Sequence, residues 1–208
     1  MWLERYVLLL MCAQPWLSGC APDTKDPSVL PASSVAPPAI GAEPAHHQSY
    51  ALTIAGYNYT DRYIDSFDVN GQGGGNLFVS SPDSGGGGGV CCVSWWTGTK
   101  LPKKVRVNWV GSYCKQTLYN KEGDSQTLTQ PVWRTAEAQI SGPIPREPHY
   151  FEVHIYGDGK VEVAITERMS EPRLVLPIDA AGNRPGVVFD DPPCPNGYDR
   201  ARARDQLR

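Results

Sequence analysis

The stretch at residues 56–96 limits the folds open to this chain more than any other. It places many aromatic residues beside two glycine clusters, at 71–76 and 85–89. A flexible linker does not carry so many aromatic side chains. A plain strand does not favour so many glycines, because each loses conformational entropy on folding and adds no side chain to pack. The stretch therefore predicts short aromatic strands joined by glycine loops.

Alternation of apolar and polar residues predicts further strands beyond residue 50. Residues 104–110 alternate with a period of two. Residues 131–140 fit a strand or a helix, and Val132-Trp133 favours the strand. Almost no helical periodicity accompanies these segments. The sequence therefore predicts a mainly β domain, either a single antiparallel β-sandwich or a partly open barrel with glycine-rich loops.

The strongest local pattern is a β-hairpin at residues 149–166. Asp158-Gly159 suits a tight primed turn between its two strands. The apolar residues of both strands can share one face of the hairpin. Glu152, His154 and Glu162 are therefore expected to face solvent.

The N-terminus has the pattern of a lipoprotein signal peptide. Residues 6–13 form an apolar segment too short to span a membrane. Small residues then precede Cys20, as in a bacterial lipobox, so residues 1–19 are predicted to be removed and Cys20 to be acylated. By resemblance to enterobacterial lipoproteins, Ala21 stands where an inner-membrane retention signal would have aspartate, which implies an outer-membrane anchor facing the periplasm. The alternative is an ordinary secretory signal with a cysteine near its cleavage point.

Composition divides the rest of the chain. Residues 20–49 are rich in proline and alanine and predict an extended, disordered tether, in which His46-His47 is interpreted as a solvated pair. The β domain is expected to span residues 50–194, and residues 195–208 form a basic tail. The net charge of −3 argues against a nucleic-acid partner.

The remaining cysteines are disulfide candidates. An even number of thiols in the oxidising periplasm favours two disulfides, with three possible connectivities. Neighbouring cysteines bond to each other only with a strained peptide geometry. A bond from Cys91 or Cys92 to Cys114 is therefore preferred, with another to Cys194. No CxxC spacing or histidine cluster suggests a metal site.

Catalytic motifs are not found in the sequence, which lacks GxSxG and HExxH. Residues 71–76 approach a dinucleotide fingerprint, but Asn76 replaces its third glycine. Residues 85–89 lack the Lys-Ser/Thr of a phosphate loop. The chain is therefore expected not to be an enzyme and to need no cofactor. The glycine clusters fit flexible hairpin connections or a conformable loop that enters a partner's cleft.

Three blocks, GYNYTDRYIDSF, VNGQGGGN and GGGGGVCC, occur in this order. They resemble the signature of a proteobacterial lipoprotein family, of which some members are immunity proteins of type VI secretion lipase (phospholipase) effectors. The resemblance covers roughly residues 50–167. It implies a periplasm-facing lipoprotein that binds and neutralises such a toxin. The alternative is a structural or accessory envelope lipoprotein without a toxin partner.

A surface that binds a toxin tightly would combine aromatic anchors with a charged rim. About half of the aromatic candidates are expected to pack in the core instead. The residues expected to contact the partner are Tyr57, Tyr59, Asp61, Arg62, Tyr63, Asp65, Gly73, Gly74, Asn76, Trp95 and Trp96.

Overall fold

The structure is a computed structural model that describes residues 48–198. The predicted signal peptide, Cys20, His46-His47 and the end of the basic tail lie outside the described residues. The described residues form eight strands and no helix. The strands are β1 (Ser49–Tyr59), β2 (Ile64–Val69), β3 (Gln72–Leu77), β4 (Gly86–Trp96), β5 (Lys103–Tyr119), β6 (Ser125–Ile140), β7 (Tyr150–Tyr156) and β8 (Val161–Thr166).

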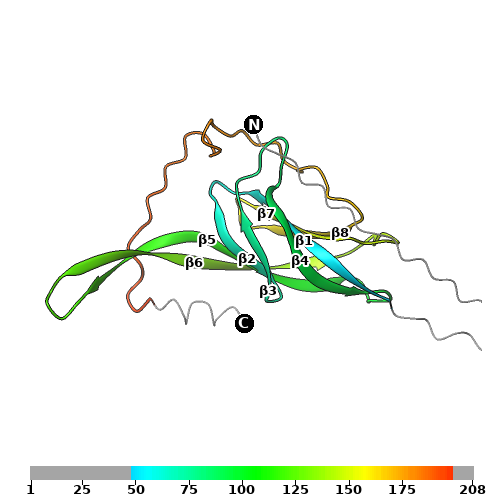
Figure 1. The fold of residues 1–208 in the computed structure, drawn as a ribbon, viewed down its shortest axis with the longest axis horizontal. Coiled ribbons are helices and arrows are strands. Elements are labelled where there is room, and N and C mark those ends of the chain that lie inside the picture. Colours follow the sequence, from blue (N-terminus) through cyan, green and yellow to red (C-terminus); the bar gives the residue numbers. More distant parts are fainter. Residues whose placement is uncertain (1–47, 199–208) are drawn as a thin grey trace, which may run out of the picture. The chain divides into compact units, whose positions relative to one another are not determined.

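All eight strands belong to one sheet, in the order β6-β5-β2-β3-β4-β1-β7-β8. Neighbouring strands run antiparallel except β1 and β7, which are parallel. The terminal strands β6 and β8 contact each other, so the sheet curls into a half-barrel (Figure 1). The mainly β prediction is confirmed, but the described strands form no sandwich and the sheet is mixed. Strand direction was missed because alternation reports which face a residue occupies, not which way a strand runs.

One apolar core cluster draws side chains from all eight strands, among them Leu52 and Ile54 of β1 and Phe67 of β2. A second, smaller cluster lies on the opposite face of β1 and contains Tyr57 and Tyr59. Residues two apart on a strand share a face, which places these tyrosines opposite Leu52 and Ile54. β1 is therefore covered on both faces.

The glycine clusters form strands rather than the predicted loops. Residues 73–75 belong to β3 and residues 86–89 to β4. A Cβ on Gly74 would lie 2.1 Å from Cζ of the buried Phe67 ring. The bare backbone therefore lets a large ring of a neighbouring strand lie against it, which replaces the missing glycine side chain.

The predicted hairpin of β7 and β8 is confirmed with a different turn, and an Asn-Gly turn joins β2 to β3. Asn70 and Gly71 both adopt positive φ, at 51° and 85°, as an Asn-Gly turn requires. β7 and β8 form the predicted hairpin, but only Gly159 of its turn has positive φ, at 86°. The Gly159 N–H donates to the carbonyl of Tyr156 (3.0 Å), so this is a type I turn with a left-handed glycine rather than a primed turn. Residues 131–140 are a strand, as favoured.

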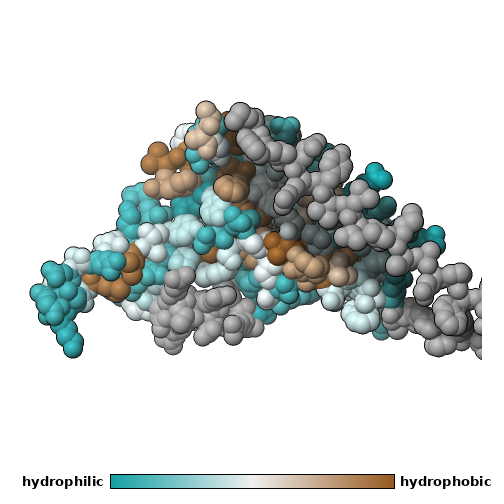
Figure 2. Space-filling view, viewed as in Figure 1, coloured by the Kyte–Doolittle hydropathy of each residue, from teal (hydrophilic) through white to brown (hydrophobic). Residues whose placement is uncertain are grey.

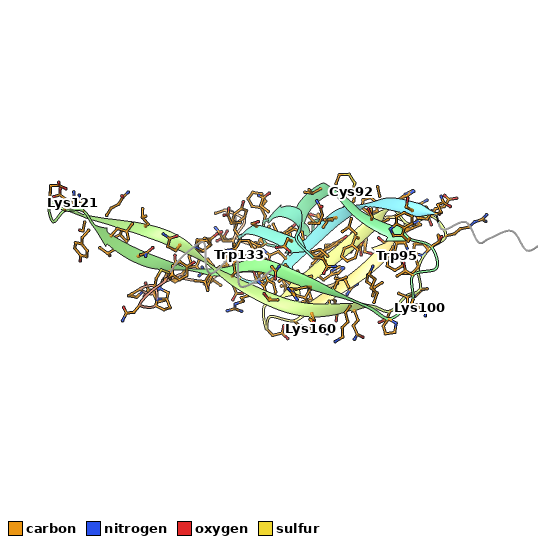
Figure 3. All side chains as sticks on the ribbon, turned by 90° about the horizontal axis from the view of Figure 1, so that it is seen from below. Cys92, Trp95, Lys100, Lys121, Trp133 and Lys160 are labelled. Atoms are coloured by element: carbon orange, nitrogen blue, oxygen red, sulfur yellow. A yellow bond between two sulfur atoms is a disulfide. The ribbon has the colours of Figure 1, made fainter. Side chains whose placement is uncertain are left out.

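β5 and β6 continue beyond the reach of β2 as a two-stranded arm, residues 112–132 (Figures 1 and 3). Lys121 marks the tip of this arm (Figure 3). Asn120 and Asp124 close the tip: the Asn120 N–H donates to the Asp124 carbonyl (2.9 Å) and the Asp124 N–H to Asn120 Oδ1 (2.7 Å). The tip is therefore a defined turn.

The disulfides are Cys91–Cys92 and Cys114–Cys194, so the preferred bond from Cys91 or Cys92 to Cys114 is wrong. Strand order explains this, because β2 and β3 lie between β4 and β5. Cys194 reaches Cys114 because residues 192–194 run along β5, where the Lys115 N–H donates to the Pro192 carbonyl (2.8 Å). Closeness in sequence was a poor guide to closeness across the sheet.

Gly74→Ala is expected to lower the free energy of unfolding by about 1–3 kcal/mol, because its Cβ would overlap the enclosed Phe67 ring. Gly73→Ala is the matched control: the same change in the same strand, with no atom within 4 Å of the added Cβ. Urea unfolding of both variants measures the difference. Equal destabilisation by the two changes would contradict this account of the glycine strand.

Candidate partner-binding surface

The chain beyond β8 forms a strap, residues 167–194, without regular secondary structure. It is drawn in yellow-orange to red in Figure 1. Three groups of polar contacts join the strap to parts of the chain that are distant in sequence.

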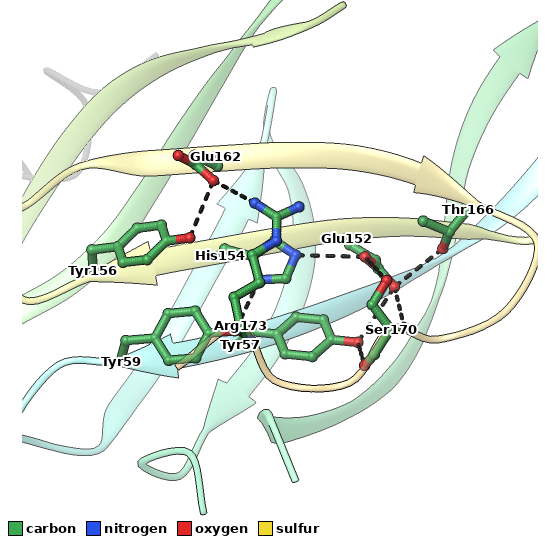
Figure 4. A network of polar contacts seen from close by, with 9 residues as sticks. All are labelled: Tyr57, Tyr59, Glu152, His154, Tyr156, Glu162, Thr166, Ser170 and Arg173. Atoms are coloured by element: carbon green, nitrogen blue, oxygen red, sulfur yellow. Dashed lines mark hydrogen bonds and ion pairs between the residues drawn. The ribbon is translucent and has the colours of Figure 1, made fainter. Parts of the chain in front are cut away.

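The first contact is a buried polar network at the start of the strap (Figure 4). Glu152 of β7 accepts hydrogen bonds from the Ser170 N–H (2.7 Å), the Ser170 hydroxyl (2.9 Å) and the Thr166 hydroxyl (3.1 Å). The Tyr57 ring stacks on His154, with centroids 4.2 Å apart. Glu152 and His154 are fully buried, so the expectation that they face solvent is wrong. The strap covers the face that the hairpin alone would expose.

The hydrogen bonds assign the protons of this network. The Nε2 atom of His154 faces the Glu152 carboxylate, an acceptor, so Nδ1 is the unprotonated nitrogen and accepts from the Tyr59 hydroxyl (3.1 Å), which itself accepts from the Arg173 N–H (2.8 Å). The imidazole then carries its proton on Nε2, 3.5 Å from Glu152 Oε2. Burial lowers the pKa of His154 and keeps it neutral. Burial also opposes ionisation of Glu152, but the adjacent imidazole of His154 and the hydrogen bonds from Ser170 outweigh it and lower that pKa from 4.5 to about 2.

This geometry suits a clasp rather than a catalytic centre. The Ser170 hydroxyl donates to the carboxylate of Glu152 and not to the imidazole of His154. His154 is therefore not placed to act as the general base for a Ser170 nucleophile. Both side chains of the acid–histidine pair have no exposed surface through which a substrate could reach them. The network therefore fixes the strap to β7.

The second contact is Arg184, a strap residue that is only 6% exposed. Its guanidinium donates to the carbonyls of Asn58 (3.4 Å) and Ser80 (2.6 Å) and to the Ser80 hydroxyl (2.8 Å). It also donates to the carbonyl of Leu176 within the strap (3.4 Å). One buried side chain thus joins the strap to the end of β1 and to the chain after β3.

The third contact holds the end of the strap. Arg62 forms an ion pair with Asp191 (3.2 Å) and lies over the Phe189 ring, 4.1 Å from its centroid. The Cys114–Cys194 disulfide follows three residues later. Residues 189–194 are therefore anchored beside the loop before β2 and along the arm.

These contacts place strap residues beside aromatic residues at the ends of β2 and β3 and on β5, in what we call the aromatic patch. Tyr63 contacts Phe78, with centroids 5.1 Å apart, and Val188 is 90% exposed. Figure 2 shows apolar atoms gathered along the course of the strap. Burial raises the pKa of Tyr113, and the nearby Asp65 carboxylate raises it further. The aromatic patch consists of Arg62, Tyr63, Phe78, Tyr113, Val188 and Phe189.

A cleft of about 330 Å³ opens beside the patch. Arg62, Val188 and Phe189 belong both to the patch and to the cleft lining, so the two form one surface. Arg134 of β6 also lines the cleft, and it makes no ion pair with the described residues. The surface therefore combines exposed apolar groups with charges of both signs, since Asp61 also lines the cleft and Arg62 is paired with Asp191.

The structure separates the residues expected to contact a partner into two groups. Four are buried and contribute no surface: Tyr57, Tyr59, Gly74 and Trp95. Seven have exposed surface: Asp61, Arg62, Tyr63, Asp65, Gly73, Asn76 and Trp96. Asn76 meets the patch through a hydrogen bond to the Tyr63 hydroxyl (2.6 Å). Trp96 lies elsewhere, because it pairs with Ser49 at the opposite end of β1.

Sequence reasoning did not select Phe78, Tyr113, Val188 or Phe189. The sequence could have indicated that Phe78 is exposed, because it follows the inward-facing Leu77 and strand alternation then points Phe78 outward. No sequence pattern indicates the positions of Val188 and Phe189, because they lie in an irregular segment that is held by contacts with residues distant in sequence.

The fold and this surface define a half-barrel domain closed by a clasped strap. The family model described as "Protein of unknown function (DUF3304)" matches residues 57–163, just over half of the 208-residue chain. The chain belongs to this family. The matched region includes Glu152 and His154 but ends before the strap. No curated protein and no solved structure matches the chain significantly. Within residues 48–198 no helix has the length and apolarity to cross a bilayer.

Glu152→Gln is expected to lower the free energy of unfolding by about 2 kcal/mol at pH 7, because charged hydrogen bonds to the strap are lost. The wild-type chain should also lose stability on acidification. The pKa of His154 is lower in the folded chain than its ordinary 6.5, so below pH 6.5 the unfolded chain binds a proton there that the folded chain does not. The pKa of Glu152 falls from 4.5 to about 2 on folding, so between these pH values the unfolded chain again binds the extra proton, and the free energy of unfolding decreases.

Urea unfolding between pH 7 and pH 2.5 measures this effect. The variant should have a flatter pH dependence below pH 4.5. The control is Glu137→Gln, whose exposed ion pair with Lys104 contributes about 0–1 kcal/mol. If the free energy of unfolding of Glu152→Gln depends on pH as steeply as that of the wild type, the Glu152 carboxylate does not hold the strap.

Proposed function

We propose that this chain is a periplasm-facing lipoprotein that binds and neutralises a type VI secretion lipase toxin. The observation that carries the proposal is the aromatic patch. Exposed tyrosine, phenylalanine and arginine side chains form the kind of cluster that supplies most of the energy at protein–protein interfaces. The family resemblance of the three sequence blocks supplies the kind of partner.

The chemistry of the patch suits a lipase. An enzyme that acts on membrane lipids must present apolar surface at the mouth of its active site. Phe78 and Val188 are 65% and 90% exposed and offer a matching apolar surface. Arg62 lies between the patch and the cleft, where it can hydrogen-bond polar groups at the rim of such a mouth. Binding there would block substrate entry and the approach of the toxin to the membrane.

The buried clasp favours binding over hydrolysis as the role of this domain. Glu152 and His154 are enclosed, and their hydrogen bonds are used to hold the strap. The strap in turn holds Val188 and Phe189 in the patch. The polar residues that most resemble catalytic groups thus support the binding surface.

Anchoring is the second part of the proposal. Acylation at Cys20 would attach the chain to the outer membrane, and the proline-rich tether would let the β domain extend into the periplasm. A toxin delivered into the periplasm would meet the domain near the membrane it attacks. The alternative role is an accessory envelope lipoprotein without a toxin partner.

A competition assay tests the proposal. The gene is deleted together with its immediate neighbour, and the strain is mixed with a parent whose type VI system is active. Restoring this gene alone should rescue survival. Tyr63→Ala combined with Phe78→Ala should not, because two central aromatic contacts cost about 100-fold or more in affinity. Trp96→Ala is the matched control, since it removes an exposed aromatic side chain away from the patch.

Circular dichroism and thermal melting establish that each variant is folded. Survival that does not depend on the gene would contradict the immunity role and favour the accessory one. Rescue by the Tyr63→Ala/Phe78→Ala variant would show that the toxin binds outside the aromatic patch.

A further inference from the structure

Arg134 is a charged residue on the core-facing side of β6. It pairs with Trp109 of β5, and residues directly opposite each other in a sheet share a face. Ala136 and Ala138 follow on the same side of β6 and pack in or against the core cluster. Alternation therefore favours an apolar side chain at position 134. The arginine instead stands where the core cluster meets the cleft, because Trp109 belongs to both.

A glycine in a β-bulge gives the Arg134 side chain its seat. Gly111 is the extra residue between Val110 and Ser112, which pair with consecutive residues of β6. A Cβ on Gly111 would lie 2.4 Å from Cδ of Arg134 and 2.7 Å from its Nε, so the side chain lies on bare backbone. The Arg134 Nη1 atom extends to the β7–β8 turn, 4.0 Å from where a Gly159 Cβ would stand. The bulge thus lets Arg134 span from β6 to this turn beside the cleft.

The positive charge of Arg134 has no ion-pair partner among the described residues. Its guanidinium also makes no hydrogen bond with them. Asp158 is the acidic residue of the neighbouring turn, and its carboxylate accepts instead from the Lys160 N–H (2.9 Å). The N–H donors of Arg134 are therefore open to a ligand.

The other charges that line the cleft are matched by groups of this chain. Arg62 pairs with Asp191 (3.2 Å). Asp61 acts on Arg184: burial lowers the pKa of that guanidinium, and the Asp61 carboxylate opposes the change. Among the described residues of the cleft lining, Arg134 is the charge left over, so the cleft has one positive charge to offer to a ligand.

Given the proposed function, on which this step rests, we infer that the cleft receives an acidic side chain of the partner protein, whose carboxylate forms an ion pair with Arg134. Val188 and Phe189 belong to both the cleft and the aromatic patch, so a protein that covers the patch also encloses the cleft. Enclosure strengthens the ion pair, because solvent and salt then screen it less. A single leftover positive charge suits a carboxylate, and Asp61 in the lining disfavours a doubly charged phosphate.

Charge variants test the ion pair against the toxin encoded by the neighbouring gene. The chain from residue 20 onward carries Cys20→Ser, so that it is free of lipid, and calorimetry measures its affinity for the purified toxin. Arg134→Glu should weaken binding about 100-fold or more, because two carboxylates would meet in the cleft. Arg134→Met should weaken it about tenfold or more, because the stem over Gly111 stays and the charge is lost. Arg146→Glu is the matched control, the same charge change at an exposed arginine outside the cleft lining, and should cost less than about threefold.

Gly111→Ala tests the seat without changing any charge. Its Cβ would displace the Arg134 side chain, so binding should weaken about tenfold. In the Arg134→Met background the same change should cost nothing further, because no charge is left to displace. A merely structural role of Gly111 would weaken binding equally in both backgrounds. Thermal melting establishes that each variant is folded.

Normal toxin binding by Arg134→Glu, with binding lost in Tyr63→Ala/Phe78→Ala, would overturn the ion pair and leave the proposed function intact. A wild-type chain that does not bind the toxin would contradict both. Binding to vesicles of phosphatidylglycerol and phosphatidylethanolamine is measured in parallel. If the chain binds these vesicles but not the toxin, and Arg134→Glu abolishes vesicle binding, Arg134 recognises lipid headgroups instead of a protein carboxylate.

Discussion

The hydrogen bonds between Glu152 and Ser170 are the interaction on which the rest of this structure depends. They join a buried carboxylate in the sheet directly to the start of the strap. Burial alone would disfavour the charge, which is stabilised by the hydrogen bonds from Ser170 and Thr166 and by the adjacent His154 ring. Once the strap is in place, the second face of β1 is covered and Tyr57 and Tyr59 become core residues.

The strap also links the fold to its proposed role. Arg184 and the Cys114–Cys194 disulfide fix its middle and its end. Between them, Val188 and Phe189 are held beside Arg62, so the patch is built from parts distant in sequence. The family match ends before these strap residues.

Local patterns predicted local structure well. The 149–166 hairpin and the Asn70-Gly71 turn follow from alternation and turn chemistry, which act between near neighbours. Glu152 and His154 were misplaced because alternation identifies two faces of a strand, and only the remote strap decides that both are buried. The 86–89 glycines were misplaced because their partners lie on other strands. Half of the patch was predictable from its aromatic stretch, and Val188 and Phe189 were not.

Hydrogen exchange measured by NMR tests the central claim most directly, namely that the strap is part of the cooperative fold. The informative amides are those of Ser170 and Arg173, which donate to Glu152 and to the Tyr59 hydroxyl. The account predicts that they exchange nearly as slowly as the β7 amides, because they open only when the clasp unfolds. Exchange as fast as in an open loop, with β7 still protected, would contradict it.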